Sequence, residues 1–205
     1  MSESSASHVV VIGGGVGGLA VAARLSVKGH QVTLLEHADR VGGKLFTYER
    51  EGFAFDTGPS LFTLPAVYRD LFLKTGKSLE QSVDLQELDP AFRYVFSDGS
   101  EVILPGVDPA KCATAFGDAF GTQAGAQWRE FTGRGAQMWR LTRGPFLQSP
   151  LKGWKSLIPL AKVRDIKSIA PFTSLRTLAR KYFTDPRMIM IVDRYATYTG
   201  SDPRR

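Results

Sequence analysis

The clearest hydrophobic pattern of the chain lies near its start. Residues 9–12 are a continuous run of Val and Ile, typical of a strand buried on both faces. A glycine-rich segment ends this run. Residues 19–25 then place small and apolar side chains at helical spacing, with Gly29 as the expected C-terminal stop. Residues 31–35 form a second apolar run, so the pattern predicts a strand–helix–strand unit.

Turn residues divide the rest of the chain into shorter elements. They predict two hairpins, which turn at Glu51–Gly52 and at Asp98–Gly99. They also predict helices over residues 65–76, 111–120, 127–141, 173–182 and 187–195. Asp108–Pro109 is expected to cap the second of these helices and Thr173 the fourth. The fold class is α/β, with a Rossmann-like unit followed by an α+β region.

The glycines after the first strand have the spacing G-x-G-x-x-G, with Gly13, Gly15 and Gly18 in the three glycine places. In a dinucleotide-binding unit the first allows a tight turn, the second lets a pyrophosphate approach the backbone, and the third lets helix and strand pack closely. Free N–H groups and the helix dipole then attract the diphosphate. The alternative is a merely structural glycine turn.

Glu36 follows the second strand, 21 residues after Gly15. This offset is typical of a carboxylate that accepts hydrogen bonds from ribose hydroxyls. Because a carboxylate repels a 2′-phosphate, the sequence favours FAD or NAD over NADP.

Composition excludes several other classes. The chain is 43% hydrophobic and 22% charged, as in ordinary globular proteins. Its single cysteine, Cys112, excludes an internal disulfide framework and is expected to be buried in a helix. The three histidines lack metal-ligand spacing. Residues 1–7 have no basic region and predict a disordered start without a signal peptide.

Charge is divided unevenly along the chain. Residues 1–133 hold 11 Lys and Arg against 16 Asp and Glu, whereas residues 134–205 hold 15 against 4. Within residues 146–183, lysines and arginines alternate with Trp, Leu and Ile. This pattern is typical of a membrane-surface segment, and the alternative is an amphipathic helix pair with solvated lysines. No nucleic-acid recognition motif accompanies the charge.

The aromatic residues of the 127–141 helix, Trp128, Phe131 and Trp139, are expected in the core.

Two further segments carry a family resemblance. Arg40-Val41-Gly42-Gly43-Lys44 follows the acidic residue, and Phe55-Asp56-Thr57-Gly58-Pro59-Ser60 follows the first hairpin. Together with the glycine spacing, they resemble the FAD-dependent carotenoid desaturases, in particular phytoene desaturases, of the amine oxidase-like flavoprotein superfamily. The resemblance runs from Val9 to Arg205. Family members are much longer than this chain, so the chain resembles an N-terminal fragment of one.

The resemblance implies a set of FAD contacts. The ADP half would lie on the glycine segment and Glu36, and the pyrophosphate and ribityl chain on the second segment. The isoalloxazine would approach Gly58-Pro59-Ser60. Lys44 stands where family members have Arg, and a lysine keeps the charge but loses the bidentate fork. The cofactor-binding residues so implied are Gly13, Gly15, Gly17, Gly18, Glu36, Arg40, Gly42, Gly43, Lys44, Gly58, Pro59 and Ser60. No side chain stands out as a catalytic base.

The resemblance also implies an activity. It is an FAD-dependent desaturation of a lipophilic, phytoene-like polyene, by a cytoplasmic protein peripheral at the membrane. Residues 1–75 would belong to the FAD-binding domain and residues 76–205 to a partial substrate-binding domain. Two alternatives remain: another amine oxidase-like flavin enzyme, such as a carotenoid isomerase or ketolase or an amine oxidase, and a non-catalytic nucleotide- or membrane-binding module.

Overall fold

The structure is a computed structural model that describes residues 6–144, 153 and 168–205. It contains two compact units, Met1–Gln86 and Glu87–Arg205. The predicted leader lies largely outside the described residues, and so does most of the predicted membrane-surface segment at 146–183.

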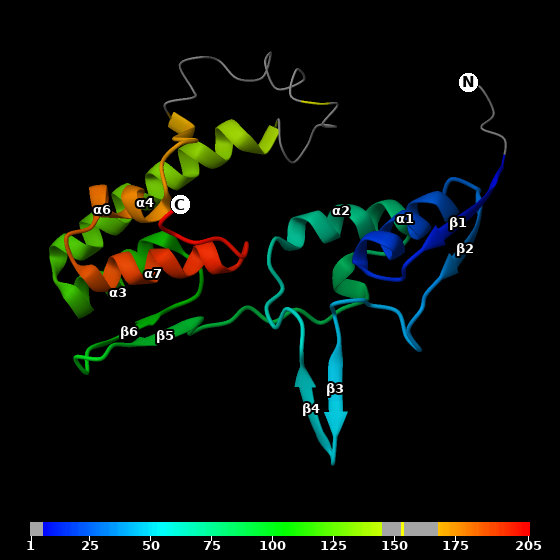
Figure 1. The fold of residues 1–205 in the computed structure, drawn as a ribbon, viewed down its shortest axis with the longest axis horizontal. Coiled ribbons are helices and arrows are strands. Elements are labelled where there is room, and N and C mark those ends of the chain that lie inside the picture. The colour runs from blue at the N-terminus through cyan, green and yellow to red at the C-terminus, as the bar shows by residue number, and fades with distance from the viewer. Residues whose placement is uncertain (1–5, 145–152, 154–167) are drawn as a thin grey trace. The chain divides into compact units, whose positions relative to one another are not determined.

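The first unit begins with the predicted strand–helix–strand arrangement (Figure 1). Strand β1 (His8–Ile12) pairs in parallel with β2 (Gln31–Leu35), with Val10 opposite Thr33. Helix α1 (Val16–Ser26) connects them and starts earlier than expected. Gly29 follows the helix with φ of 86°, the left-handed conformation that glycine adopts without strain. A Rossmann-like βαβ unit is therefore present.

One expectation for this sheet is wrong. The first strand was expected to be buried on both faces, yet the side chains of Val10 and Ile12 are 51% and 86% exposed. The reason is that β1 and β2 form a two-stranded sheet and α1 covers one face of it. On the other face alternate residues of β1 meet solvent.

The remainder of the first unit is a hairpin and a helix. Strands β3 (Thr47–Arg50) and β4 (Phe53–Asp56) pair antiparallel around Glu51 and Gly52, which both have positive φ, so the predicted turn is confirmed. Helix α2 (Pro65–Thr75) ends at Gly76 as expected. The short η1 helix (Leu79–Gln81) packs against α2 and extends the unit to residue 86.

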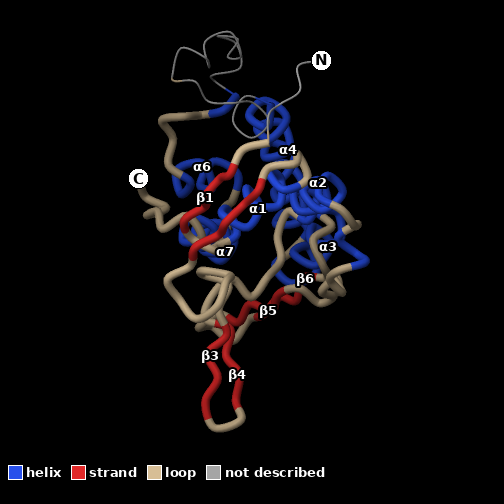
Figure 2. Tube along the Cα trace, turned by 90° about the vertical axis from the view of Figure 1, so that its right-hand side faces the viewer, coloured by secondary structure: helices blue, strands red, loops and turns tan. Residues whose placement is uncertain are grey.

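The second unit is a hairpin packed with helices, and Figure 2 shows both kinds of element. Strands β5 (Phe92–Val95) and β6 (Glu101–Leu104) flank the predicted Asp98–Gly99 turn. The helices are α3 (Pro109–Phe120), α4 (Thr122–Thr142), α6 (Leu175–Tyr182) and α7 (Pro186–Thr197). Their buried core includes Phe116, Trp128, Phe183, Met188 and Val192.

Local expectations in this unit have mixed outcomes. The Asp108 carboxylate accepts a hydrogen bond from the Ala110 N–H, so the predicted cap of α3 is confirmed. The predicted cap of α6 is wrong, because Ser174 rather than Thr173 accepts from the Thr177 N–H.

Cys112 is buried in α3 as expected. Trp139 is 43% exposed and not a core residue, because it lies on α4 beyond the cluster around Trp128.

Within the described residues, no helix has the length and apolar character that crossing a bilayer requires.

Candidate functional site

The glycine loop between β1 and α1 is held to the end of β2. The Gly13 N–H donates to the Leu35 carbonyl at 2.7 Å, and Gly13 has a φ of 96°. A Cβ at Gly18 would overlap the Gly13 carbonyl oxygen. Only glycine at position 18 therefore lets the start of α1 approach the end of β1 this closely.

Glu36 lies beside this loop, at the carboxyl end of β2. Its Oε2 accepts a hydrogen bond from the Gly14 N–H at 2.6 Å, and its Oε1 accepts one from the Ala38 N–H at 2.9 Å. The donors of Ala38 and Gly14 hold the pKa of this carboxyl below its ordinary value. Glu36 is therefore an oriented, ionised carboxylate that retains further lone pairs for ligand hydroxyls.

Gly14 is a site residue that the glycine spacing missed. A Cβ there would lie 2.9 Å from Val41 Cγ1 and 3.0 Å from Glu36 Oε2. A side chain at position 14 would therefore crowd Val41 and the Glu36 carboxylate, which would have to shift. The available signal was that Gly14 is the middle glycine of the run Gly13-Gly14-Gly15, where the spacing needs none.

The second glycine pair lies directly against the first loop. The Gly42 N–H donates to the Gly14 carbonyl at 2.8 Å, and Gly15 and Gly42 form a parallel bridge. A Cβ at Gly43 would lie 3.0 Å from the Gly15 Cα. The structure thus brings together the two glycine segments and Glu36, which the sequence predicted separately.

Gly15 and Gly17 differ from their neighbours because the protein itself leaves room for side chains there. A Cβ at Gly17 would meet nothing within 4 Å, and one at Gly15 would make only an ordinary contact, 3.9 Å from Gly43. Gly15 has a φ of −73°, which any residue adopts, and it caps α1 without a side-chain hydrogen bond. Neither packing nor backbone strain demands glycine at these two positions. Open backbone at a helix N-terminus fits a bound diphosphate.

The remaining predicted residues lie on the following loop and around the hairpin. Arg40 donates to the Thr47 carbonyl at 2.7 Å, and its guanidinium lies 3.6 Å from the centre of the Phe46 ring. A Cβ at Gly58 would overlap the Lys44 carbonyl oxygen, so these two backbones are in close contact. The side chains of Lys44, Pro59 and Ser60 are exposed. Asp56 accepts a hydrogen bond from the Thr47 hydroxyl at 2.9 Å across the hairpin, which is a structural contact.

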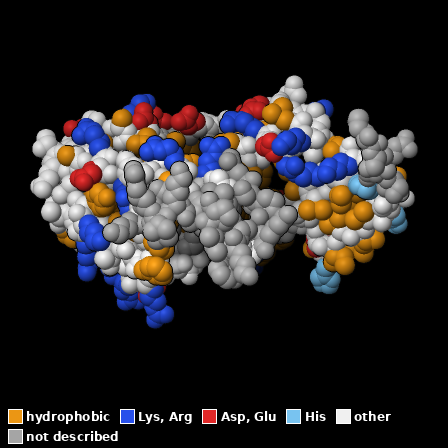
Figure 3. Space-filling model, turned by 90° about the horizontal axis from the view of Figure 1, so that it is seen from above, with side chains coloured by type: hydrophobic (Ala, Val, Ile, Leu, Met, Phe, Trp, Pro, Cys, Tyr) orange, Lys and Arg blue, Asp and Glu red, His pale blue; other side chains and the backbone are white. Residues whose placement is uncertain are grey.

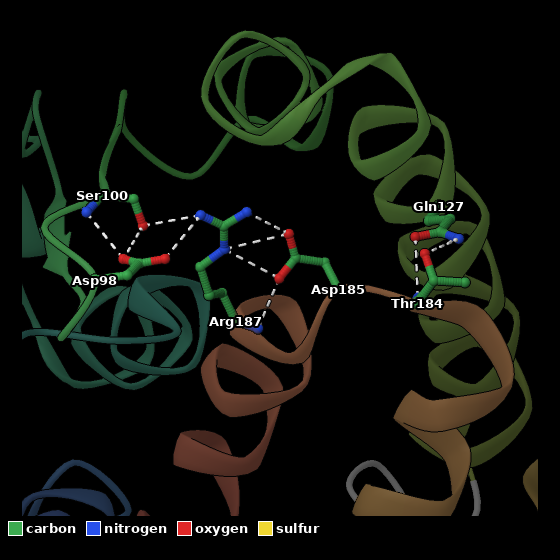
Figure 4. A network of polar contacts seen from close by, with 6 residues as sticks. All are labelled: Asp98, Ser100, Gln127, Thr184, Asp185 and Arg187. Atoms are coloured by element: carbon green, nitrogen blue, oxygen red, sulfur yellow. Dashed lines mark hydrogen bonds and ion pairs between the residues drawn. The ribbon is translucent and has the colours of Figure 1, made fainter.

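A separate polar network lies in the second unit (Figure 4). The Arg187 guanidinium pairs with Asp185 at 2.6 Å and Asp98 at 3.3 Å, and it lies 4.1 Å from the Phe120 ring centre. The guanidinium lowers the pKa of Asp185, whereas hydrogen bonds from Ser100 are the largest cause of the lowered pKa of Asp98. This network joins the turn of the β5–β6 hairpin to the start of α7. Its charges pair internally, which indicates a structural role.

Comparisons with known proteins agree with this geometry. Residues 11–73 match the family model described as "NAD(P)-binding Rossmann-like domain". The chain is 32% identical over 204 residues to the 4,4'-diapolycopene oxygenase of Methylomonas sp. This alignment covers 99% of this chain and 41% of the relative. It is 31% identical over 212 residues to the carotenoid 3,4-desaturase of Haloarcula japonica, over 100% of this chain and 41% of the relative.

A further relative and a solved structure with a similar fold also match the chain. The phytoene desaturase of Cercospora nicotianae is 32% identical over 203 residues, with 98% of this chain and 32% of the relative covered. A solved structure of putrescine oxidase bound to putrescine has a TM-score of 0.51 at 18% identity, over 94% of this chain and 36% of that one. The chain thus spans about two fifths or less of the length of these relatives.

Proposed function

Because the chain is homologous along nearly its whole length to carotenoid desaturases and oxygenases, we propose that it binds FAD in a flavin-dependent oxidoreductase of carotenoid biosynthesis. The substrate class we propose is a phytoene-like polyene, and the reaction a desaturation. Substrate and reaction are proposed for a whole protein of the relatives' length. This chain would supply its nucleotide-binding part.

One observation carries the cofactor assignment. Gly15 and Gly17 leave open backbone at the N-terminus of α1, where this chain's own packing requires no glycine. Beside this opening, Glu36 presents an ionised carboxylate. A diphosphate and an adjacent ribose are the ligand groups that match backbone donors next to an anionic acceptor.

The chain's residues would divide the binding task. The N–H groups at the start of α1 would donate to the diphosphate, while Glu36 would accept from ribose hydroxyls. Gly42 and Gly43, which lie against Gly15, would extend the surface along the diphosphate. Lys44 would add a positive charge near the phosphates. Arg40, engaged with Phe46 and Thr47, would keep the loop in place, and Gly58, Pro59 and Ser60 would approach the flavin ring. Bound FAD would supply the electron acceptor for removal of hydrogen from a C–H bond.

The substrate class also bears on where the protein works. Polyenes of this kind partition into membranes, so we propose a cytoplasmic protein that is peripheral at the membrane surface. Two observations support this proposal: the relatives include a carotenoid 3,4-desaturase and a phytoene desaturase, and the stretch 146–183 is basic and rich in aromatic residues. Most of that stretch lies outside the described residues.

The test of the cofactor assignment is flavin retention. The purified chain is scanned for flavin absorbance, and released FAD is quantified after denaturation, for the wild type and for Gly15→Glu. The new carboxylate would occupy and repel the diphosphate position, so we expect stoichiometric FAD in the wild type and its loss in the variant. Ser26→Glu, which adds the same charge at the exposed far end of α1, is the matched control and should retain FAD.

Substrate assays separate the desaturase proposal from its alternatives. Conversion of phytoene in liposomes, without turnover of amines, supports a carotenoid enzyme, whereas amine oxidation favours an amine oxidase. A folded wild type that binds no FAD even when FAD is supplied would contradict the cofactor proposal. That result would favour a non-catalytic module.

A further inference from the structure

One arginine of the second unit is surrounded by aromatic rings. Arg194, in the last turn of α7, donates from Nη1 to the Tyr94 hydroxyl at 2.6 Å and from Nη2 to the Tyr198 hydroxyl at 2.8 Å. Its guanidinium carbon lies 5.0 Å from the ring centre of Phe92, 5.5 Å from that of Tyr94 and 5.6 Å from that of Tyr198. The rings of Tyr195 and Tyr198 lie 6.0 Å apart, centre to centre. We call these five residues the Arg194 cluster.

The charge of Arg194 has no carboxylate partner in the part of the chain that the structure describes. Other arginines of the same unit differ in this respect, because Arg176, Arg187 and Arg204 each pair with an aspartate. Arg194 bonds instead to the oxygens of neutral phenols. Its positive charge is therefore available to an anionic ligand, with which a guanidinium makes stronger hydrogen bonds than with a neutral group.

The hydrogen bonds from Arg194 also determine what the phenols offer to a ligand. A phenol oxygen that accepts from a guanidinium directs its own O–H elsewhere, so the Tyr198 hydroxyl is a donor toward a further partner. The side chain of Tyr198 is 62% exposed and that of Tyr195 44%. Burial, and next the neighbouring Tyr94, raise the pKa of Tyr195 to about 12, so this phenol stays neutral. The cluster thus presents donors and exposed rings, and no anionic acceptor.

The negative end of the α7 dipole lies near the cluster, and it is outweighed. The carbonyls of Tyr195, Ala196 and Thr197 accept from N–H groups of the turn that follows the helix. The Arg194 carbonyl accepts from the Thr197 hydroxyl at 2.6 Å. These acceptors are occupied, and the full charge of a guanidinium exceeds the partial charge of a helix C-terminus.

We propose that the Arg194 cluster binds an oxyanion that carries a flat ring, such as a nucleotide phosphate or an aromatic carboxylate. Arg194 and the Tyr198 hydroxyl donate to the anionic oxygens, and the rings of Tyr195 and Tyr198 contact the ring of the ligand. The cluster shares no residue with the proposed FAD site. Each of the two proposals can therefore fail without the other.

The experiment titrates the 205-residue chain with inorganic phosphate, AMP and benzoate at low salt, and calorimetry measures the affinity. We expect a Kd of about 1 mM for phosphate, and about tenfold tighter binding of the ligand whose ring the cluster accepts, AMP or benzoate. The NMR signal of the Arg194 Nε–H, assigned by its loss in Arg194→Met, should shift during the titration. AMP should shift this signal equally in Gly15→Glu, in which the proposed cofactor site is blocked.

Two variants of the cluster separate binding from folding. Arg194→Met removes the charge and should weaken binding by about tenfold or more, but it also removes the contact between α7 and Tyr94. Tyr198→Phe keeps the ring of an exposed residue and removes only its hydroxyl, so it should weaken binding by about fivefold with unchanged urea unfolding.

A control variant measures general attraction of anions to the surface. Figure 3 shows Lys and Arg side chains at several places on one face of the second unit. Arg180→Met removes an exposed arginine of α6 and should change the Kd by less than about twofold.

Four results would overturn this site. They are the absence of binding of all three anions, equal weakening by Arg194→Met and Arg180→Met, unchanged binding in Tyr198→Phe, and loss of the AMP-induced shift in Gly15→Glu. The last result would place AMP at the proposed cofactor site. FAD content is measured in Tyr198→Phe and should equal that of the wild type, so the cofactor proposal is judged separately.

Discussion

The Glu36 carboxylate holds the backbone of Gly14, 22 positions earlier in the chain, through a 2.6 Å hydrogen bond from the Gly14 N–H to Oε2. The same carboxylate holds the Ala38 N–H through its other oxygen. Glu36 therefore joins the glycine loop to the loop that follows β2. A residue predicted only as a ribose acceptor also fixes the shape of the diphosphate loop.

We predict that Glu36→Gln weakens FAD retention. The amide has one acceptor oxygen in place of two, so either the Gly14 or the Ala38 N–H loses its partner. Released flavin per mole of protein measures the effect, and Glu49→Gln on the exposed β3 strand is the control.

Because the folded pKa of Glu36 is lowered, its stabilising contribution is present above the unfolded value of about 4.3 and is lost as pH falls through the folded value. Unchanged retention in Glu36→Gln would contradict this role.

Gly18 and Gly17 form a matched pair of adjacent helix positions. Gly18→Ala forces a Cβ onto the Gly13 carbonyl oxygen, so we expect a loss of about 1–3 kcal/mol in the stability of the first unit. Gly17→Ala meets open space and should stabilise α1 by up to about 1 kcal/mol without cofactor. Hydrogen exchange of the α1 amides measures both. Equal effects of the two substitutions would show that the close approach at Gly18 is absent.

Arg187→Met should destabilise the second unit by about 1–3 kcal/mol. The substitution leaves Asp185 and Asp98 without their guanidinium and removes the cation from the Phe120 ring. Urea unfolding followed by Trp fluorescence measures it, because the three tryptophans all lie after residue 86. Arg93→Ala, which breaks the exposed Arg93–Glu101 pair of the same hairpin, should cost no more than about 1 kcal/mol.

The same network predicts a pH dependence. The lowered pKa values of Asp185 and Asp98 mean that their contribution is fully present above the unfolded value of about 3.9 and is lost as pH falls through the folded values. Stability of the wild type should therefore fall below about pH 4, and this fall should be shallower in Arg187→Met. Parallel pH profiles of the two proteins would contradict the assignment.

Cys112 should report the unfolding of the second unit. It is buried in α3, and burial, with the nearby Asp108 charge, raises the pKa of its thiol, so the reactive thiolate is suppressed in the folded state. We expect slow labelling by a thiol reagent in buffer and rapid labelling at the urea concentration where Trp fluorescence changes. Fast labelling of the folded protein would place Cys112 at the surface.

Local sequence was sufficient for most elements. The Val and Ile run, the glycine turn and the second apolar run predicted the βαβ unit, because strand and helix periodicity are properties of neighbouring residues. Asp98–Gly99 and Glu51–Gly52 likewise predicted their turns, since positive φ is a local demand. Ser174 was missed as a cap because Thr173 and Ser174 are adjacent and both can cap, and the exact first residue of the helix decides which of them does.

The sequence by itself determined the fold class, the order of elements and the glycine spacing of the candidate site. Only the tertiary structure decided that Gly42 pairs with Gly15, that Gly14 lies close against the side chains of Glu36 and Val41, and that Val10 and Ile12 remain exposed. These relationships join residues distant along the chain or depend on what covers a sheet face. Periodicity describes neighbours in sequence, and it carries no information about neighbours in space.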